Sequence, residues 1–143
     1  IIITFNFYRN IFHSLNVFRM PIVLSILNSI FFISFVAFAW VNLNDKDSWL
    51  WVPIYMFAAI VCGLAVFKSF YPATTLTAIC FYLAYAIVLF FVKDGVLDWI
   101  TKYNARHIAQ TMQATKPYIE KTREFFGLLI ITGALLINLF VQL

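Results

Sequence analysis

Residues 21–43 read PIVLSILNSIFFISFVAFAWVNL, a run of 23 positions without a charged side chain. Three further uncharged runs follow at residues 48–67, 69–92 and 125–143, with lengths of 20, 24 and 19. A helix needs about 20 apolar residues to cross the hydrocarbon core of a bilayer. The four runs therefore predict an all-α integral membrane protein, a four-helix bundle whose transmembrane helices occupy about these ranges.

The composition fits a membrane protein and disfavours two other classes. Hydrophobic residues make up 64% of the chain and charged residues only 11%, whereas soluble domains average about 25% charged residues. A soluble domain of this length leaves too much of its surface exposed to hide such a composition. The net charge of +4 rests on ten basic residues without a basic stripe, so the lipid bilayer is the expected partner and nucleic acid is not.

The segment between the third and fourth runs is the longest polar stretch of the chain. Apolar residues recur there at helical spacing, which predicts a short amphipathic segment at the membrane interface; they are Val96, Trp99, Ile100 and Tyr103, with Ile108 and Met112 continuing a weaker face. Asp94-Gly95 is a plausible stop for the third helix. Pro117 suits the first turn of a new helix, which we expect to continue into the fourth run.

We divide the chain into residues 20–143, the transmembrane domain, and residues 1–19, an N-terminal extension with two open interpretations. Five apolar residues of the extension fall on one helical face, which is typical of an interfacial helix; they are Tyr8, Ile11, Phe12, Leu15 and Phe18. Alternatively, because Met20 directly precedes the first run, the extension is translated sequence upstream of the true start. Both interpretations remain open at the level of the sequence.

Counting four spans places the turn at residues 44–48 and the polar stretch at residues 93–124 on the same face of the membrane. Seven basic residues lie on this face, against three on the other, Arg9, Arg19 and Lys68. Basic residues are enriched in cytoplasmic loops, so we expect this face to be cytoplasmic. Aromatic rings favour the headgroup region, and we expect Trp40, Trp49 and Trp51 to lie there beside the turn.

This shared face also gathers the candidate polar site. The first turn contributes Asn42, Asn44, Asp45 and Asp47, and the start of the fourth helix contributes Glu120, Arg123 and Glu124. A stripe of Glu120, Glu124, Gly127, Ile131, Ala134 and Asn138 follows at helical steps, and its small residues indicate that it faces the bundle interior. One interpretation is a pocket for a cation, a lipid headgroup or a small polar ligand. The other is a structural set in which Asp47 caps a helix and Glu120 pairs with Arg123.

Catalytic and metal-binding patterns are not recognisable in the sequence. No nucleophile stands beside a base, and neither histidine, His13 or His107, falls within a span. We expect Cys62 and Cys80 to be packing residues, the serines and threonines of the spans to hydrogen-bond between helices, and Asn28 and Asn138 to bond across helices. The sequence therefore predicts no enzyme, no cofactor and no metal site.

Two segments resemble the signatures of the transmembrane protein 220 family. The first is Asn42-Leu-Asn44-Asp45-Lys-Asp47 with Trp51-Val-Pro53-Ile-Tyr55, and the second is Glu120-Lys-Thr-Arg123-Glu124-Phe-Phe-Gly127-Leu128. The stretches at residues 93–99 and 108–112 resemble bacterial members in particular. The resemblance implies a four-helix protein of the bacterial cytoplasmic (inner) membrane, and it adds Trp51 and Tyr55 to the candidate polar site. It implies no reaction.

Two functions follow as expectations. The first is a non-enzymatic accessory, scaffold or interaction subunit, working as a homo-oligomer or with a membrane protein partner. The alternative is a small oligomeric transporter, or a membrane protein that binds a polar ligand or cation in a pocket at the membrane edge. Enclosed space between the first turn and the last helix favours the alternative.

Overall fold

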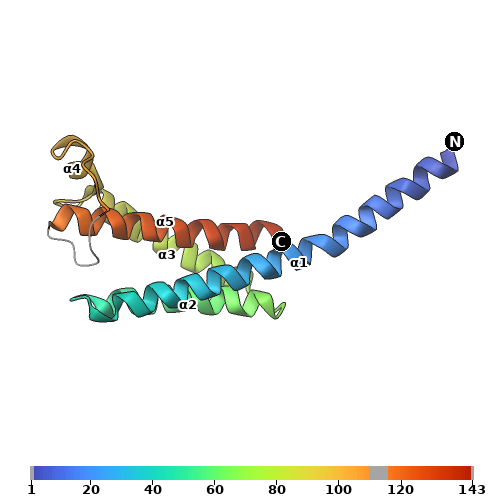
Figure 1. The fold of residues 1–143 in the computed structure, drawn as a ribbon, viewed down its shortest axis with the longest axis horizontal. Helices are drawn as coiled ribbons and strands as arrows, with labels where there is room; N and C mark the ends of the chain where they lie inside the picture. Colours follow the sequence, from blue (N-terminus) through green and yellow to red (C-terminus); the bar gives the residue numbers. More distant parts are fainter. Residues whose placement is uncertain (1, 110–115, 143) are drawn as a thin grey trace.

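The computed structural model describes residues 2–109 and 116–142, with side chains for residues 21–109 and 116–142. The long helices are α1 (Ile2–Val41), α2 (Ser48–Val66), α3 (Pro72–Phe91) and α5 (Pro117–Gln142) (Figure 1). A 3-10 turn, η1 (Asn42–Asn44), and a short helix, α4 (Val96–Thr101), complete the elements described. Four segments within these helices are long and apolar enough to cross a membrane, which confirms the predicted four-helix membrane fold.

The bundle consists of two helix pairs. Helix α1 packs along α2, and α3 packs along α5, while α2 and α5 also touch (Figure 1). The part of α1 before Pro21 projects beyond the other helices. Proline is tolerated inside transmembrane helices because neighbouring groups satisfy the freed backbone carbonyl. The first membrane span begins at Pro21, as predicted, and α1 extends before it. The role of residues 1–19 stays a prediction.

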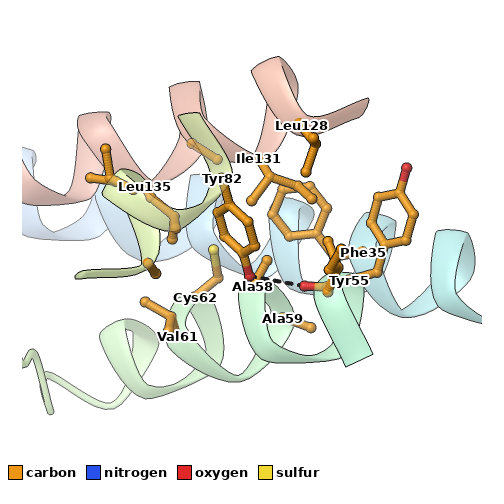
Figure 2. Close-up of a cluster of buried hydrophobic side chains, with 14 of the residues drawn as sticks. Phe35, Tyr55, Ala58, Ala59, Val61, Cys62, Tyr82, Leu128, Ile131 and Leu135 are labelled. Carbon is orange, nitrogen blue, oxygen red and sulfur yellow. Dashed lines mark hydrogen bonds between the residues drawn. The ribbon is translucent and has the colours of Figure 1, made fainter. Parts of the chain in front are cut away.

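The core joins the two pairs through small and aromatic side chains (Figure 2). Ala58, Ala59 and Cys62 of α2 are fully buried, and small residues let neighbouring backbones approach closely. The hydroxyl of Tyr82 on α3 donates to the carbonyl oxygen of Ile54 on α2 at 3.0 Å. Cys62 thus packs as predicted, whereas Cys80 is exposed on α3, so the expectation of a packing role is wrong there.

A reciprocal pair of amides links α1 to α5 inside the membrane. Asn28 Nδ2 donates to Asn138 Oδ1 at 2.7 Å, and Asn138 Nδ2 donates to Asn28 Oδ1 at 2.6 Å. Both side chains are buried, and each amide also donates to a carbonyl one turn back, that of Leu24 or Ala134. The expected bond across helices is confirmed for these asparagines.

Three serine and threonine hydroxyls of the spans bond within their own helix, not between helices as expected. Ser29, Thr75 and Thr77 each donate to the carbonyl four residues earlier in their own chain. A short hydroxyl side chain reaches this carbonyl without help from another helix. The prediction that these hydroxyls bond between helices is therefore wrong for the three residues.

Helix α3 ends at Phe91, before the predicted stop. Asp94 takes the positive φ of 59°, which is the conformation expected of the glycine. Gly95 serves a different purpose, because a Cβ there would collide with the Leu89 carbonyl oxygen and lie 2.8 Å from that of Val92. The Asp94-Gly95 pair thus makes the tight turn that follows the helix, and Gly95 permits the close backbone approach.

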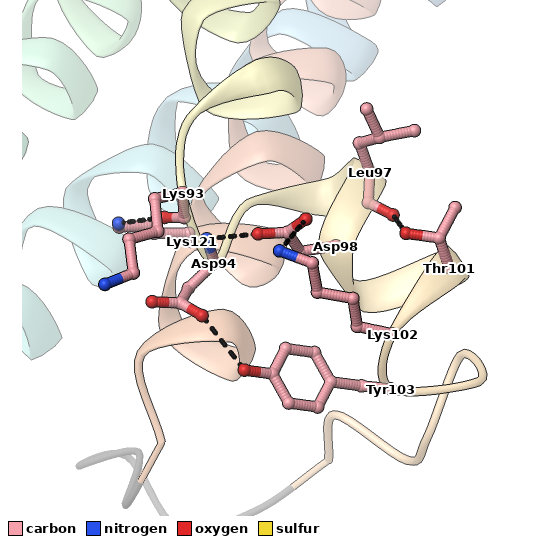
Figure 3. A network of polar contacts seen from close by, with 8 residues as sticks. All are labelled: Lys93, Asp94, Leu97, Asp98, Thr101, Lys102, Tyr103 and Lys121. Atoms are coloured by element: carbon pink, nitrogen blue, oxygen red, sulfur yellow. Dashed lines mark hydrogen bonds and ion pairs between the residues drawn. The ribbon is translucent and has the colours of Figure 1, made fainter.

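The polar stretch folds back onto α5 through side-chain contacts (Figure 3). Tyr103 Oη donates to Asp94 Oδ1 at 2.9 Å, and Lys121 Nζ of α5 donates to the Lys93 carbonyl at 2.6 Å. The hydrogen bond to Asp94 raises the pKa of Tyr103, because a phenolate has no proton to donate. A short helix, α4, lies in the predicted segment, and α5 begins at Pro117 as predicted. The position of α4 at the membrane interface stays a prediction. Met112 lies outside the described residues.

We expect Asn28→Leu and Asn138→Leu each to destabilise the protein by about 1–2 kcal/mol, because each leaves a buried amide without its partner. The double variant removes both amides and should recover much of this loss. Unfolding of the four proteins in mixed micelles, followed by circular dichroism, gives the coupling energy. A double variant that loses the full sum of the single effects contradicts the pairing.

Candidate ligand pocket at the membrane edge

The first turn and the start of α5 meet at one end of the bundle. Glu120 and Glu124 lie one helical turn apart on α5, and Asp47 directly precedes α2. One carboxylate oxygen from each of these three residues lies within 4.8 Å of the other two. The sequence predicted that these acids share a membrane face, and the structure brings them into one cluster.

Asp47 is held by the indole of Trp51. Trp51 Nε1 donates to Asp47 Oδ2 at 3.1 Å, one turn along α2. Asp47 occupies the N-cap position, yet its side chain accepts no bond from the first turn of the helix. The predicted capping by the Asp47 carboxylate is therefore wrong, since the indole fixes the carboxylate toward α5.

Trp51 differs from the tryptophans near it in the sequence. It is 1% exposed, whereas Trp40 and Trp49 are 74% and 75% exposed. The placement of the latter two at headgroup level stays a prediction. Trp51 instead stacks obliquely on Tyr55 and Tyr85, with ring centroids 6.1 and 5.8 Å away, and forms a rigid wall behind the acids.

A cavity of about 390 Å³ lies beside the acidic cluster, between α1 and α5. Its polar lining comprises Asn42, Asp45, Glu120, Arg123 and Glu124, together with the aromatic Trp51 and Tyr55. Its apolar lining comprises Phe35, Phe38, Val41, Ile108, Phe126, Gly127 and Ile130. Pockets for small molecules have this size and this mixture of apolar walls with a few polar groups.

Seven of the nine predicted site residues line this cavity. Asp47 does not line it, but its carboxylate lies next to three residues that do, Trp51, Glu120 and Glu124. Asn44 is the exception, because it is exposed and does not line the cavity. Asn42 uses its amide to donate to the Phe38 carbonyl at 2.7 Å, which satisfies an acceptor at the end of α1. Asn44 therefore lies apart from the other predicted residues, and their role as a binding site stays a prediction.

The apolar wall was missed at the level of the sequence. Phe35, Phe38 and Val41 follow one another at steps of three residues on α1, and Phe126 and Ile130 are four residues apart on α5. Such spacing marks one face of a helix. The same spacing that places the polar residues could have found these five together, but apolar residues of a membrane helix occur on every face.

The stripe on α5 faces the interior as predicted, except at its exposed end, Glu120. Ile131, Ala134 and Asn138 are at most 2% exposed. Gly127 packs against the tip of Tyr55, since a Cβ at position 127 would lie 2.5 Å from the Tyr55 hydroxyl oxygen. The glycine thus gives Tyr55 the space to extend along the cavity wall.

The charges of the side chains around the cavity favour a positively charged ligand. Three carboxylates line the cavity and Asp47 adds a fourth next to them, against one guanidinium, that of Arg123. Carboxylates held close together repel one another unless a proton or a cation is shared between them. The aromatic rings add attraction for a cation over their faces.

The family model described as "Transmembrane family 220, helix" matches residues 34–140. The matched range includes every residue that lines the cavity. No curated protein and no solved structure matches the chain.

We expect Gly127→Ala to destabilise the protein by about 1–3 kcal/mol, because the added methyl group displaces Tyr55. Gly133→Ala is the matched control, since nothing lies within 4 Å of a Cβ at that position; it should be neutral or stabilising by up to about 1 kcal/mol.

Tyr55→Phe should rescue Gly127→Ala, because it removes the one atom that the methyl group meets closely. Thermal unfolding of the single and double variants in one detergent provides the comparison. If Gly127→Ala and Gly133→Ala behave alike, the contact between Gly127 and Tyr55 does not limit the packing.

Proposed function

The chain belongs to transmembrane family 220, and from this membership and the acidic cavity between α1 and α5 we propose that it is a non-enzymatic membrane protein that binds an organic cation at the edge of the bilayer. The observation that carries the proposal is the cavity of about 390 Å³, whose lining combines acids of the first turn and of α5 with aromatic side chains. Space of this size is what a bound small molecule needs.

The chemistry of the lining supports a cation as the ligand. Asp45, Glu120 and Glu124 supply acceptors on one side of the cavity, and aromatic side chains form much of the rest. A bare metal ion needs only oxygen ligands at short distances and makes no use of apolar walls. An ammonium group on an organic body uses both the acids and the rings.

The lining also supports a non-enzymatic role. Among the residues that the structure describes, the lining contains no serine, threonine, cysteine, histidine or lysine that could act as a nucleophile. The acids alone can exchange protons, which serves binding as well as chemistry.

We further propose that the protein is a bacterial-type member that resides in the bacterial cytoplasmic membrane, with the cavity at the cytoplasmic face. Seven basic residues lie on this side, namely Lys46, Lys93, Lys102, Arg106, Lys116, Lys121 and Arg123. This bias is the one that places loops in the cytoplasm.

An accessory or interaction subunit is the second candidate, and it is favoured by a groove between α2 and α3. The groove has a volume of about 650 Å³, and small side chains of α3 line it, namely Ala73, Thr74, Thr77 and Ala78. Small residues permit close helix contacts in membranes, whereas Gly127 and Ala134 are already used inside the bundle. A homo-oligomer formed here would also meet the need of a small transporter for more helices.

For the binding function, we expect ethylammonium to stabilise the detergent-solubilised protein against heat. A ligand at about 100 times its dissociation constant adds about 2.7 kcal/mol. Glu124→Gln should abolish the effect. Asp98→Asn should retain it, because Asp98 lies outside the cavity and pairs with Lys102 at 2.9 Å.

Two outcomes of the same titration contradict the proposal. One is an equal response of the wild type and Glu124→Gln. The other is stabilisation by Mg²⁺ or Ca²⁺ with none by ethylammonium, which indicates a metal site formed by Asp47, Glu120 and Glu124.

For the second candidate, we expect native mass spectrometry from nanodiscs to detect an oligomer, and Thr77→Phe to reduce its share by filling the groove. Leu76→Phe is the control, since Leu76 is 51% exposed and lies outside the groove. A wild-type protein that is wholly monomeric and free of partners argues against this candidate.

A further inference from the structure

We propose that the cation is the headgroup of a membrane phospholipid that carries a primary ammonium group. The inference rests on the proposed binding function and specifies its ligand. It follows from the depth of the cavity, its opening toward the bilayer and the arrangement of both charge signs along its wall.

The cavity reaches from the aqueous face into the hydrocarbon region. Its lining on α5 extends from Glu120 to Ile130, ten residue steps that span about 15 Å of helix. On α1 it extends from Val41 back to Phe35, about 9 Å of helix. A small water-soluble cation would occupy the acidic end alone, whereas an amphiphile uses the full depth.

The deep part of the wall is continuous with the surface that faces lipid. Phe38, Phe126 and Ile130 line the cavity and are 43%, 39% and 55% exposed. In a bilayer, side chains at this depth are exposed to acyl chains and not to water. A lipid can therefore enter sideways, with its chains remaining in the membrane and its headgroup beside the acids.

The two charge signs of the wall match a zwitterionic headgroup. Glu120 and Glu124 flank Arg123 on the first turns of α5. Carboxylates bind the ammonium, and a guanidinium binds phosphate through several N–H donors. Arg123 has five such donors, so it can contact a phosphate as well as a protein neighbour. An anionic lipid without an ammonium would leave the carboxylates unneutralised.

A primary ammonium fits the wall better than a quaternary one. It offers three N–H donors, and the acidic end of the cavity offers the oxygens of Asp45, Glu120 and Glu124 as acceptors. A trimethylated ammonium has no donor and relies on an aromatic cage. The structure thus assigns selectivity to the carboxylates and affinity for the lipid body to the phenylalanines.

The test uses the full chain in nanodiscs made from an equimolar mixture of ethanolamine, choline and glycerol phospholipids with identical acyl chains. After transfer into mild detergent, lipids retained by the protein are quantified by mass spectrometry. We expect ethanolamine phospholipid to be retained about tenfold over the choline lipid, since a charge-assisted hydrogen bond corresponds to at least this factor. Glu124→Gln should remove the preference, and the control Asp98→Asn should keep it.

Equal retention of the ethanolamine and choline lipids overturns the inference, as does a preference that survives Glu124→Gln. Stabilisation by ethylammonium without any lipid preference overturns the lipid ligand and leaves the proposed function standing. Failure of both the lipid and the ethylammonium experiments removes the proposed function itself. Arg123→Gln distinguishes phosphate binding from ammonium binding. It should weaken lipid retention severalfold without changing the response to ethylammonium.

Discussion

Inside a bilayer every polar group must find its partner within the protein, and the amides of Asn28 and Asn138 meet this requirement through each other. Their bond connects α1 to α5, which belong to different helix pairs. Tyr82 makes the second polar link, from α3 to the Ile54 carbonyl of α2. The bundle is therefore two packed pairs joined by polar contacts within the predicted spans, and the cavity and the groove lie between the pairs.

The cavity and the amide contact lie at different levels of the bundle. The amides join α1 and α5 near the C-terminus of α5, whereas the cavity lies between these helices nearer the start of α5. Trp51 and Tyr55 of α2 form part of the cavity wall. The Asp47 carboxylate is aimed by the Trp51 indole, so the acidic cluster depends on the aromatic wall that also lines the cavity.

Much of the fold was predictable because a helix that crosses a lipid bilayer needs about 20 consecutive residues without charged side chains. Uncharged runs located the four spans, and Pro117 gave the start of α5. Asn28 and Asn138 were expected to bond across helices, and they do so with each other. The individual contacts at the helix ends were not predictable. Whether Asp47 bonds to the backbone or to Trp51, and whether Asn44 faces the cavity or the solvent, depends on the rotation of each helix. Apolar residues on all sides of a membrane helix conceal that rotation, and for this reason the phenylalanine wall was not found.

The hydrogen bonds between the Asn28 and Asn138 side chains also provide a pivot between α1 and α5. Asn138 lies 14 residues beyond Glu124 on α5, about 21 Å along the axis. A tilt of one helix pair about this point leaves the amides together and displaces the carboxylates in proportion to that distance. A change in the angle between the two pairs therefore alters the width of the cavity mouth more than it alters the contact between the amides.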